Sequence, residues 1–201
     1  MIQEKTRTAA SGYLALAVLP TLALLCGWQL IRAALAGDVL TAVLFGLAMV
    51  VILICFNGFF MVHPNQAKVL QLFGSYAGSV RQTGLRWANP FYSKVAVSLR
   101  VRNFESGQMK VNDSSGNPID IAAVVVWKVV DSAEAVFEVD DYESFVHIQS
   151  EAALRNMATS YPYEAHGGEE IALRSHPQEI AEKLRGEVQD RLDRAGVEVI
   201  E

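Results

Sequence analysis

Residues 39–62 read VLTAVLFGLAMVVILICFNGFFMV and contain no charged side chain. The run exceeds the roughly 20 residues that an α-helix needs to cross the hydrocarbon core of a bilayer. A second uncharged run, TAASGYLALAVLPTLALLCGWQLI, covers residues 8–31, and only residues 32–38 separate the two. Gly37-Asp38 in this connector is a turn signal. The pattern therefore predicts two transmembrane helices that form a tight antiparallel hairpin.

The first run has other interpretations. Lys5 and Arg7 precede its apolar core, as in a cleaved signal peptide, although the run is longer than such a core and a second run follows. Pro20 would kink the helix, so a re-entrant hairpin that enters and leaves by one face stays an alternative to two spans. Cys26 and Cys55 would differ in depth by roughly 9 Å, which predicts free thiols.

Composition divides the chain in two after the hairpin. Overall, 51% of the residues are hydrophobic and 19% are charged. Residues 1–60 hold 3 basic and 2 acidic residues, whereas the remainder holds 14 basic and 20 acidic residues, as a soluble surface does. The chain is predicted to consist of an N-terminal tail and hairpin over 1–62 and one domain over 63–201. The acidic balance argues against nucleic acid as a partner.

The distribution of positive charge predicts the orientation of the hairpin. Either form of hairpin returns the chain to its starting side, so the N-terminal tail and the domain share a compartment. Basic residues flank the outer ends of the hairpin: Lys5, Arg7, Lys68, Arg81 and Arg86. The connector has Arg32 offset by Asp38. The positive-inside rule places both ends in the cytoplasm, which predicts a multi-pass protein of the cell inner (plasma) membrane.

The domain begins with strands. Residues 67–73 and 94–104 alternate apolar and polar side chains, the period of half-buried strands, with glycines at the turns between them. Residues 108–111 and 119–130 flank a turn-rich connection and predict a second antiparallel hairpin. Residues 121–126 are apolar throughout, which predicts a central strand covered on both faces.

Two helices are predicted to follow. Asp140 and Glu143 have the spacing of a capping box, so a helix is expected from Asp141 to about Ser160. It has two apolar faces, one with Phe145 and Ile148. The other face carries the residues that we expect to contact another subunit: Leu154, Met157 and Ala158. Complete burial inside one domain is the alternative interpretation of this pattern.

The last predicted helix covers about residues 178–195 and has one apolar stripe on a charged surface. Gly196 is expected to cap it. Residues 197–200 then begin a strand at which the sequence stops, so we expect that the domain could be truncated at its C-terminus.

Catalytic motifs are absent from the sequence. It has no phosphate-binding loop, nucleophile elbow or zinc-finger spacing. His147 with Glu151, and His166 with Glu169 and Glu170, could each begin a cation site, but each group lacks further ligands at a usable spacing. Solvated polar side chains are the expected interpretation of both groups, and no metal or cofactor is expected.

A basic segment with aromatic residues predicts a membrane contact. Between Asp38 and Glu105 there is no acidic residue, whereas six basic residues lie there, which suits anionic lipid headgroups. The segment also has aromatic residues of the kind that settle at bilayer interfaces. The expected contacts with the membrane surface are Arg81, Leu85, Arg86, Trp87, Phe91 and Tyr92. A turn whose aromatics pack into the sheet is the alternative.

Several blocks of the sequence together resemble the stomatin/prohibitin/flotillin group, known as the SPFH or band 7 family, and in particular its bacterial stomatin-like members. The blocks begin with PNQAKVLQLFGSYAGSVRQTGLRWANPFY and SLRVRNFES, which lie within residues 64–106. VNDSSGNPIDIAAVVVWKVVDSAEAVFEVDDY and FVHIQSEAALRNMATSYPY follow, within residues 111–163. The resemblance covers about residues 60–201 and rests on the combination of blocks.

The resemblance implies an α+β fold, in which the transmembrane hairpin precedes a membrane-apposed SPFH domain of antiparallel strands and helices. It implies a non-enzymatic scaffold that assembles into large homo-oligomers. Such a scaffold would organise membrane microdomains and confine or regulate membrane proteins, such as an ATP-dependent protease. The segment from Gly84 to Tyr92 matches the family's membrane-facing turn. A regulatory subunit dedicated to one membrane protease or channel is the alternative function. The long C-terminal helix usual in the family is not in this sequence.

Overall fold

The structure is a computed structural model that describes residues 4–164 and 171–201. The described residues form two compact units, one within Lys5–Ala96 and the other within Val97–Glu201 together with Glu4. Two apolar N-terminal helices followed by antiparallel sheets and further helices agree with the predicted α+β fold.

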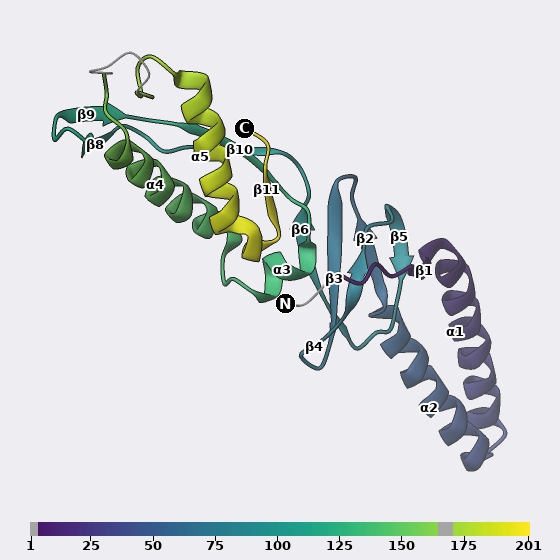
Figure 1. Ribbon diagram of the computed structural model, residues 1–201. Helices are drawn as coiled ribbons and strands as arrows, with labels where there is room; N and C mark the ends of the chain where they lie inside the picture. Colours follow the sequence, from purple (N-terminus) through teal and green to yellow (C-terminus); the bar gives the residue numbers. More distant parts are fainter. Residues whose placement is uncertain (1–3, 165–170) are drawn as a thin grey trace. The chain divides into compact units, whose positions relative to one another are not determined.

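The first unit contains the helical hairpin. Helix α1 covers Gly12–Leu35 and α2 covers Val39–Phe56, and Figure 1 shows them side by side. Gly37 takes a φ of 74° in the connector, and the Asp38 side chain accepts a hydrogen bond from the Thr41 N–H. This capped turn confirms the predicted connector. Cys26 and Cys55 are both free, as expected.

Two small antiparallel sheets complete the first unit. In one sheet the strand order is β1-β5-β2, with β1 at Ala10–Ser11, β5 at Gly84–Trp87 and β2 at Phe59–Val62. In the other the order is β4-β3-β6, with β3 at Gln66–Leu72, β4 at Ser75–Val80 and β6 at Tyr92–Ser98. A buried cluster formed by Phe60, Val62, Leu70 and Val80 joins the two sheets.

Strand β2 lies inside the uncharged run that was predicted as the second membrane span. Helix α2 ends at Phe56, and the chain then turns through Asn57 and Gly58 into the sheet. The four residues of β2 read FFMV, as apolar as a membrane segment, because Phe60 and Val62 enter the protein core. The domain boundary after Val62 stays a prediction, although pairing with the sheet already begins at Phe59.

The second unit is built on a sheet with the order β11-β10-β7. Its strands are β7 at Arg102–Glu105, β10 at Val124–Val129 and β11 at Val197–Val199. Strand β10 is central, as predicted, but Val124 is 56% exposed, so the strand is half-buried and not covered on both faces. A separate hairpin pairs β8, Met109–Asn112, with β9, Pro118–Ile121.

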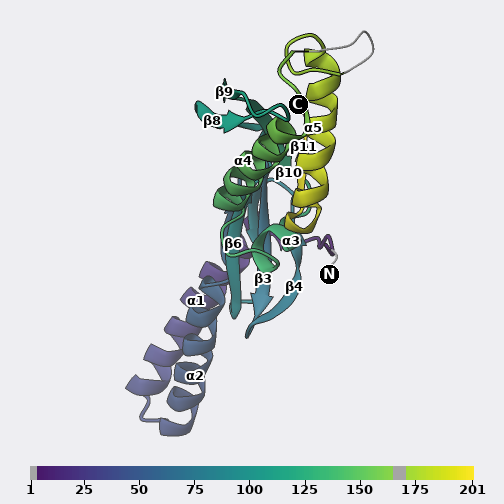
Figure 2. The same cartoon turned by 60° about the vertical axis from the view of Figure 1, so that its left-hand side comes forward.

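Three helices accompany this second sheet. They are α3 at Ser132–Phe137, α4 at Tyr142–Ser160 and α5 at Pro177–Leu192, and Figure 2 shows α4 beside α5. Asp141 caps α4, one residue after the predicted cap. A short 3₁₀ turn at Asp193–Ala195 extends α5, and Gly196 follows with a φ of 62°, which confirms the predicted glycine cap.

Candidate membrane-contact site

Both ends of the helical hairpin are joined to the same strand. Strand β1, which runs directly into α1, pairs with β5 through Ala10–Trp87 and Ser11–Arg86. Strand β2, which follows α2, pairs with the other edge of β5 from Phe59–Trp87 to Val62–Gly84. The two helices therefore leave from one small sheet and run away from it together (Figure 1).

Side chains from the sheets cap the carboxyl end of α2. The indole Nε1 of Trp87 donates to the Cys55 carbonyl at 3.0 Å, and the Lys94 Nζ donates to the Asn57 carbonyl at 2.6 Å. The last carbonyls of a helix lack partners within it and carry partial negative charge, so a cation is favourable here. Partial burial lowers the pKa of the Lys94 ammonium below its usual value. We call this region the membrane junction; it consists of Cys55–Gly58 at the end of α2, Trp87–Phe91 and Lys94.

At the membrane junction the backbone at position 58 lies very close to that of Ala88, because Gly58 has no side chain. A Cβ atom there would lie 2.4 Å from the Ala88 carbonyl oxygen and 2.5 Å from the Trp87 Nε1. The Ala88 N–H donates to the Gly58 carbonyl at 3.1 Å, and the Asn57 side-chain amide donates to the Pro90 carbonyl at 2.9 Å. These bonds hold the loop after β5 directly against the end of α2.

Alternation along β5 separates the predicted membrane-contact residues. Leu85 and Trp87 are paired with Met61 and Phe59, and paired side chains share one face of a sheet. That face is apolar. Arg86 is paired with the core residue Phe60 and so lies on the opposite face. Its Nη2 donates to the Thr83 carbonyl at 3.1 Å.

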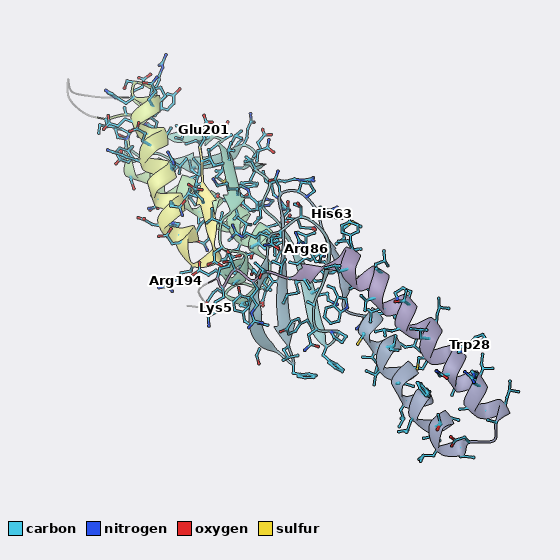
Figure 3. All side chains as sticks on the ribbon, turned by 90° about the vertical axis from the view of Figure 1, so that its right-hand side faces the viewer. Lys5, Trp28, His63, Arg86, Arg194 and Glu201 are labelled. Atoms are coloured by element: carbon cyan, nitrogen blue, oxygen red, sulfur yellow. The ribbon has the colours of Figure 1, made fainter. Side chains whose placement is uncertain are left out.

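The other predicted contact residues also differ in their surroundings. Tyr92 packs against the core cluster, as the alternative interpretation of this segment expected, and its hydroxyl accepts a hydrogen bond from the Arg7 Nη1. Phe91 is 58% exposed. Arg81 is exposed just after β4. Figure 3 shows Arg86 at the sheet and Trp28 farther along the hairpin.

Phe73 joins this site although the sequence analysis did not select it. It lies at the β3–β4 turn with a φ of 49°, and its side chain is 86% exposed. Its ring centroid is 6.3 Å from that of Phe91. Two exposed aromatic rings from different turns thus meet beside the membrane junction. An aromatic residue directly before Gly74 at a turn was the available signal, but the alternating pattern assigned Phe73 to the strand.

The predicted subunit contacts on α4 need correction. Leu154, Met157 and Ala158 are all buried within this chain, so they offer no surface to a second subunit. The alternative interpretation, burial inside one domain, describes them. Ile148 on the same helix is 63% exposed and is the large apolar side chain that α4 leaves uncovered.

The described residues provide no metal-binding group of three or more His, Cys, Asp or Glu side chains. The His147 ring stacks on Phe104 with centroids 4.0 Å apart. The second candidate group, His166 with Glu169 and Glu170, lies outside the described residues. The side chains gathered at the described part of this site are apolar, aromatic and cationic.

Comparison with known families supports the same class of protein. Residues 60–201 match the model of the SPFH domain / Band 7 family. The chain therefore belongs to this family, which confirms the resemblance seen in the sequence. Members of the family oligomerise, associate with membranes and are generally non-enzymatic scaffolds, so membership is consistent with a membrane scaffold role. A search of curated proteins found no match.

Proposed function

We propose that this protein is a homo-oligomeric integral membrane scaffold that organises membrane microdomains and confines or regulates membrane proteins. One observation carries the proposal: both ends of the apolar hairpin pair with β5. This arrangement holds the first sheets of the SPFH domain at the point where the helices enter the bilayer.

The dimensions of the hairpin support insertion into a bilayer. Helix α1 has 24 residues and α2 has 18, which correspond to lengths of about 36 Å and about 27 Å. A hydrocarbon core is about 30 Å thick, so α1 is long enough to span it with some tilt. Helix α2 is about 3 Å shorter than the core and would span it with slight local thinning of the bilayer. None of the residues of α2, a fully described helix, is buried within the protein, so its apolar side chains need lipid around them.

The distribution of basic residues supports insertion of the hairpin into the inner (plasma) membrane with the domain on the cytoplasmic side. Lys5 and Arg7 lie beside β4, and Lys94 lies in β6, so these basic residues are at the sheet end of the hairpin. The connector at the other end has Arg32 offset by Asp38. The positive-inside rule then favours a cytoplasmic sheet end.

We propose that the membrane surface contacts Phe73 and Phe91 together with the apolar β5 face of Leu85 and Trp87. Trp87 and Lys94 are already bonded to the end of α2, so this part of the sheet lies next to the lipid if α2 spans the bilayer. Exposed aromatic rings are favourable at such an interface. Arg81 would add attraction to anionic headgroups, while Arg86 contributes from the core-facing side of β5.

Copies held in this way would meet within the plane of the membrane and enclose lipids and client proteins, including a membrane-bound ATP-dependent protease. Crosslinking of the full-length protein in native membranes tests this. The scaffold predicts a ladder of self-crosslinked species that extends well beyond a dimer. A single stoichiometric complex with one different membrane protein, without a self-ladder, would contradict the scaffold and favour the dedicated regulatory subunit.

A further inference from the structure

The N-terminal segment Lys5–Ser11 is bound along the edges of both sheets of the first unit. The Ser79 N–H donates to the Lys5 carbonyl at 2.9 Å, and the Arg7 N–H donates to the Ser79 carbonyl at 2.8 Å. These bonds form a parallel bridge between Thr6 and Ser79 on β4. Ala10 and Ser11 then pair with β5. One short segment thus extends two different sheets before it enters the membrane as α1.

The surface of β4 and β6 that contacts this segment has a glycine that leaves room for it and two tyrosine hydroxyls that accept hydrogen bonds from it. Gly78 has a φ of 140°, and a Cβ atom there would lie 2.7 Å from the Arg7 Cγ and 3.0 Å from the Lys5 carbonyl oxygen. The Lys5 N–H donates to the Tyr76 hydroxyl at 3.1 Å, and the Arg7 Nη1 donates to the Tyr92 hydroxyl at 3.2 Å.

Backbone and side-chain contacts here are typical of a strand-addition site. In that mode of recognition, main-chain hydrogen bonds to a sheet edge give affinity, and side-chain pockets give specificity. Without the segment, β4 and β5 would both be edge strands of their sheets, because the sheet orders are β4-β3-β6 and β1-β5-β2. Uncovered edges offer unpaired backbone groups to other chains. The two tyrosine hydroxyls and the space above Gly78 suit an extended, basic ligand.

We propose that the edges of β4 and β5 form a strand-addition site for an extended basic segment, that Lys5–Ser11 of the same chain occupies it, and that this occupancy fixes α1 to the sheets. The site uses the backbone edge of β5, whereas the proposed lipid contact uses the side chains of Leu85 and Trp87 on one face of that strand. When it is vacated, it accepts the same segment from another molecule. The proposal does not depend on the number of subunits in the assembled protein.

A pair of proline substitutions isolates the backbone contact. In a parallel bridge of this kind, the Arg7 N–H faces Ser79 and the Thr6 N–H faces away. Arg7→Pro removes the bonding N–H, whereas Thr6→Pro removes the other one and serves as the matched control. Arg7→Ala keeps the N–H and controls for the loss of charge.

Two measurements on the full-length protein in one detergent test the proposal. Hydrogen exchange of the Ser79 amide should accelerate about tenfold or more in Arg7→Pro and change little in Thr6→Pro and Arg7→Ala. A labelled peptide with the sequence of Glu4–Ser11 should bind Arg7→Pro about tenfold more tightly than the wild type, whose site is filled, and should restore protection at Ser79. Equal exchange in the two proline variants, or equal peptide binding by Arg7→Pro and the wild type, would overturn the proposal.

Discussion

Gly58 allows Trp87 and the loop after β5 to lie close to the end of α2. Replacing it with alanine would place a methyl group within 2.5 Å of the Ala88 oxygen and the Trp87 nitrogen, so the loop and the helix must separate. We expect Gly58→Ala to lower the free energy of unfolding by about 1–3 kcal/mol, the usual range for overpacking. Thermal unfolding in one detergent measures this change.

Gly46→Ala is the matched control for that substitution. Gly46 lies within α2, whereas Gly58 follows its end. A Cβ atom at Gly46 would meet nothing within 4 Å. The unfolding temperature of Gly46→Ala should stay close to that of the wild type. If Gly58→Ala were equally well tolerated, the close junction between α2 and the loop would not contribute to stability.

Asp113 is predicted to make the stability of the second unit depend on pH. Its largely buried carboxylate accepts hydrogen bonds from the backbone N–H groups of Ser115, Asn117 and Tyr163. The bond from Tyr163 is the main cause that lowers the pKa of Asp113. Because the folded pKa lies below the unfolded value of about 3.9, the stabilisation is complete above pH ~4 and is lost as the pH falls through the folded pKa.

Amide hydrogen exchange at Tyr163 and Asn117 measures this dependence. In the wild type, protection relative to the intrinsic exchange rate should fall as the pH is lowered below about 4. Asp113→Asn should weaken protection at neutral pH and remove most of this acid-dependent loss, because no carboxylate remains to titrate. Asp120→Asn, at an exposed site on β9, is the control and should behave as the wild type does. An unchanged profile in Asp113→Asn would contradict this role.

At the scale of elements, the long helices were predictable and the short pieces that join them were not. Uncharged runs locate α1 and α2 within a few residues, because a membrane helix needs a long apolar sequence. The same criterion hides β2, since FFMV is apolar in a core strand for a different reason. The two-residue β1 depends on pairing with β5, which no local pattern contains.

The candidate site was predictable only in part for the same reason. The sequence selected the segment Gly84–Tyr92 from its basic and aromatic residues. It could not tell that Arg86 and Trp87 lie on opposite faces of β5 or that Phe73 comes next to Phe91, because strand register and turn position determine both.

Strand β2 also provides a test of which part of the first sheets contacts lipid. His63 follows β2 and lies roughly 13 Å along the strand from Phe59, away from the end of α2. We expect spin labels at Phe73→Cys and Phe91→Cys, in a background without Cys26 and Cys55, to be relaxed more strongly by oxygen than by a water-soluble nickel chelate. A label at His63→Cys should show the opposite preference. Equal water accessibility at all three positions would exclude the proposed membrane contact.

For the whole molecule, we propose that the hairpin, whose two ends pair with β5, holds the SPFH domain at the bilayer so that copies assemble side by side. Two observations support this proposal. The strands at both ends of the hairpin pair with β5, and members of the family oligomerise. Electron-microscopic imaging of the full-length protein, extracted together with native lipid, tests it most directly. We predict closed assemblies of many copies with the protein domain in contact with the lipid. Single copies, or domains that stand clear of the bilayer on an extended linker, would contradict it.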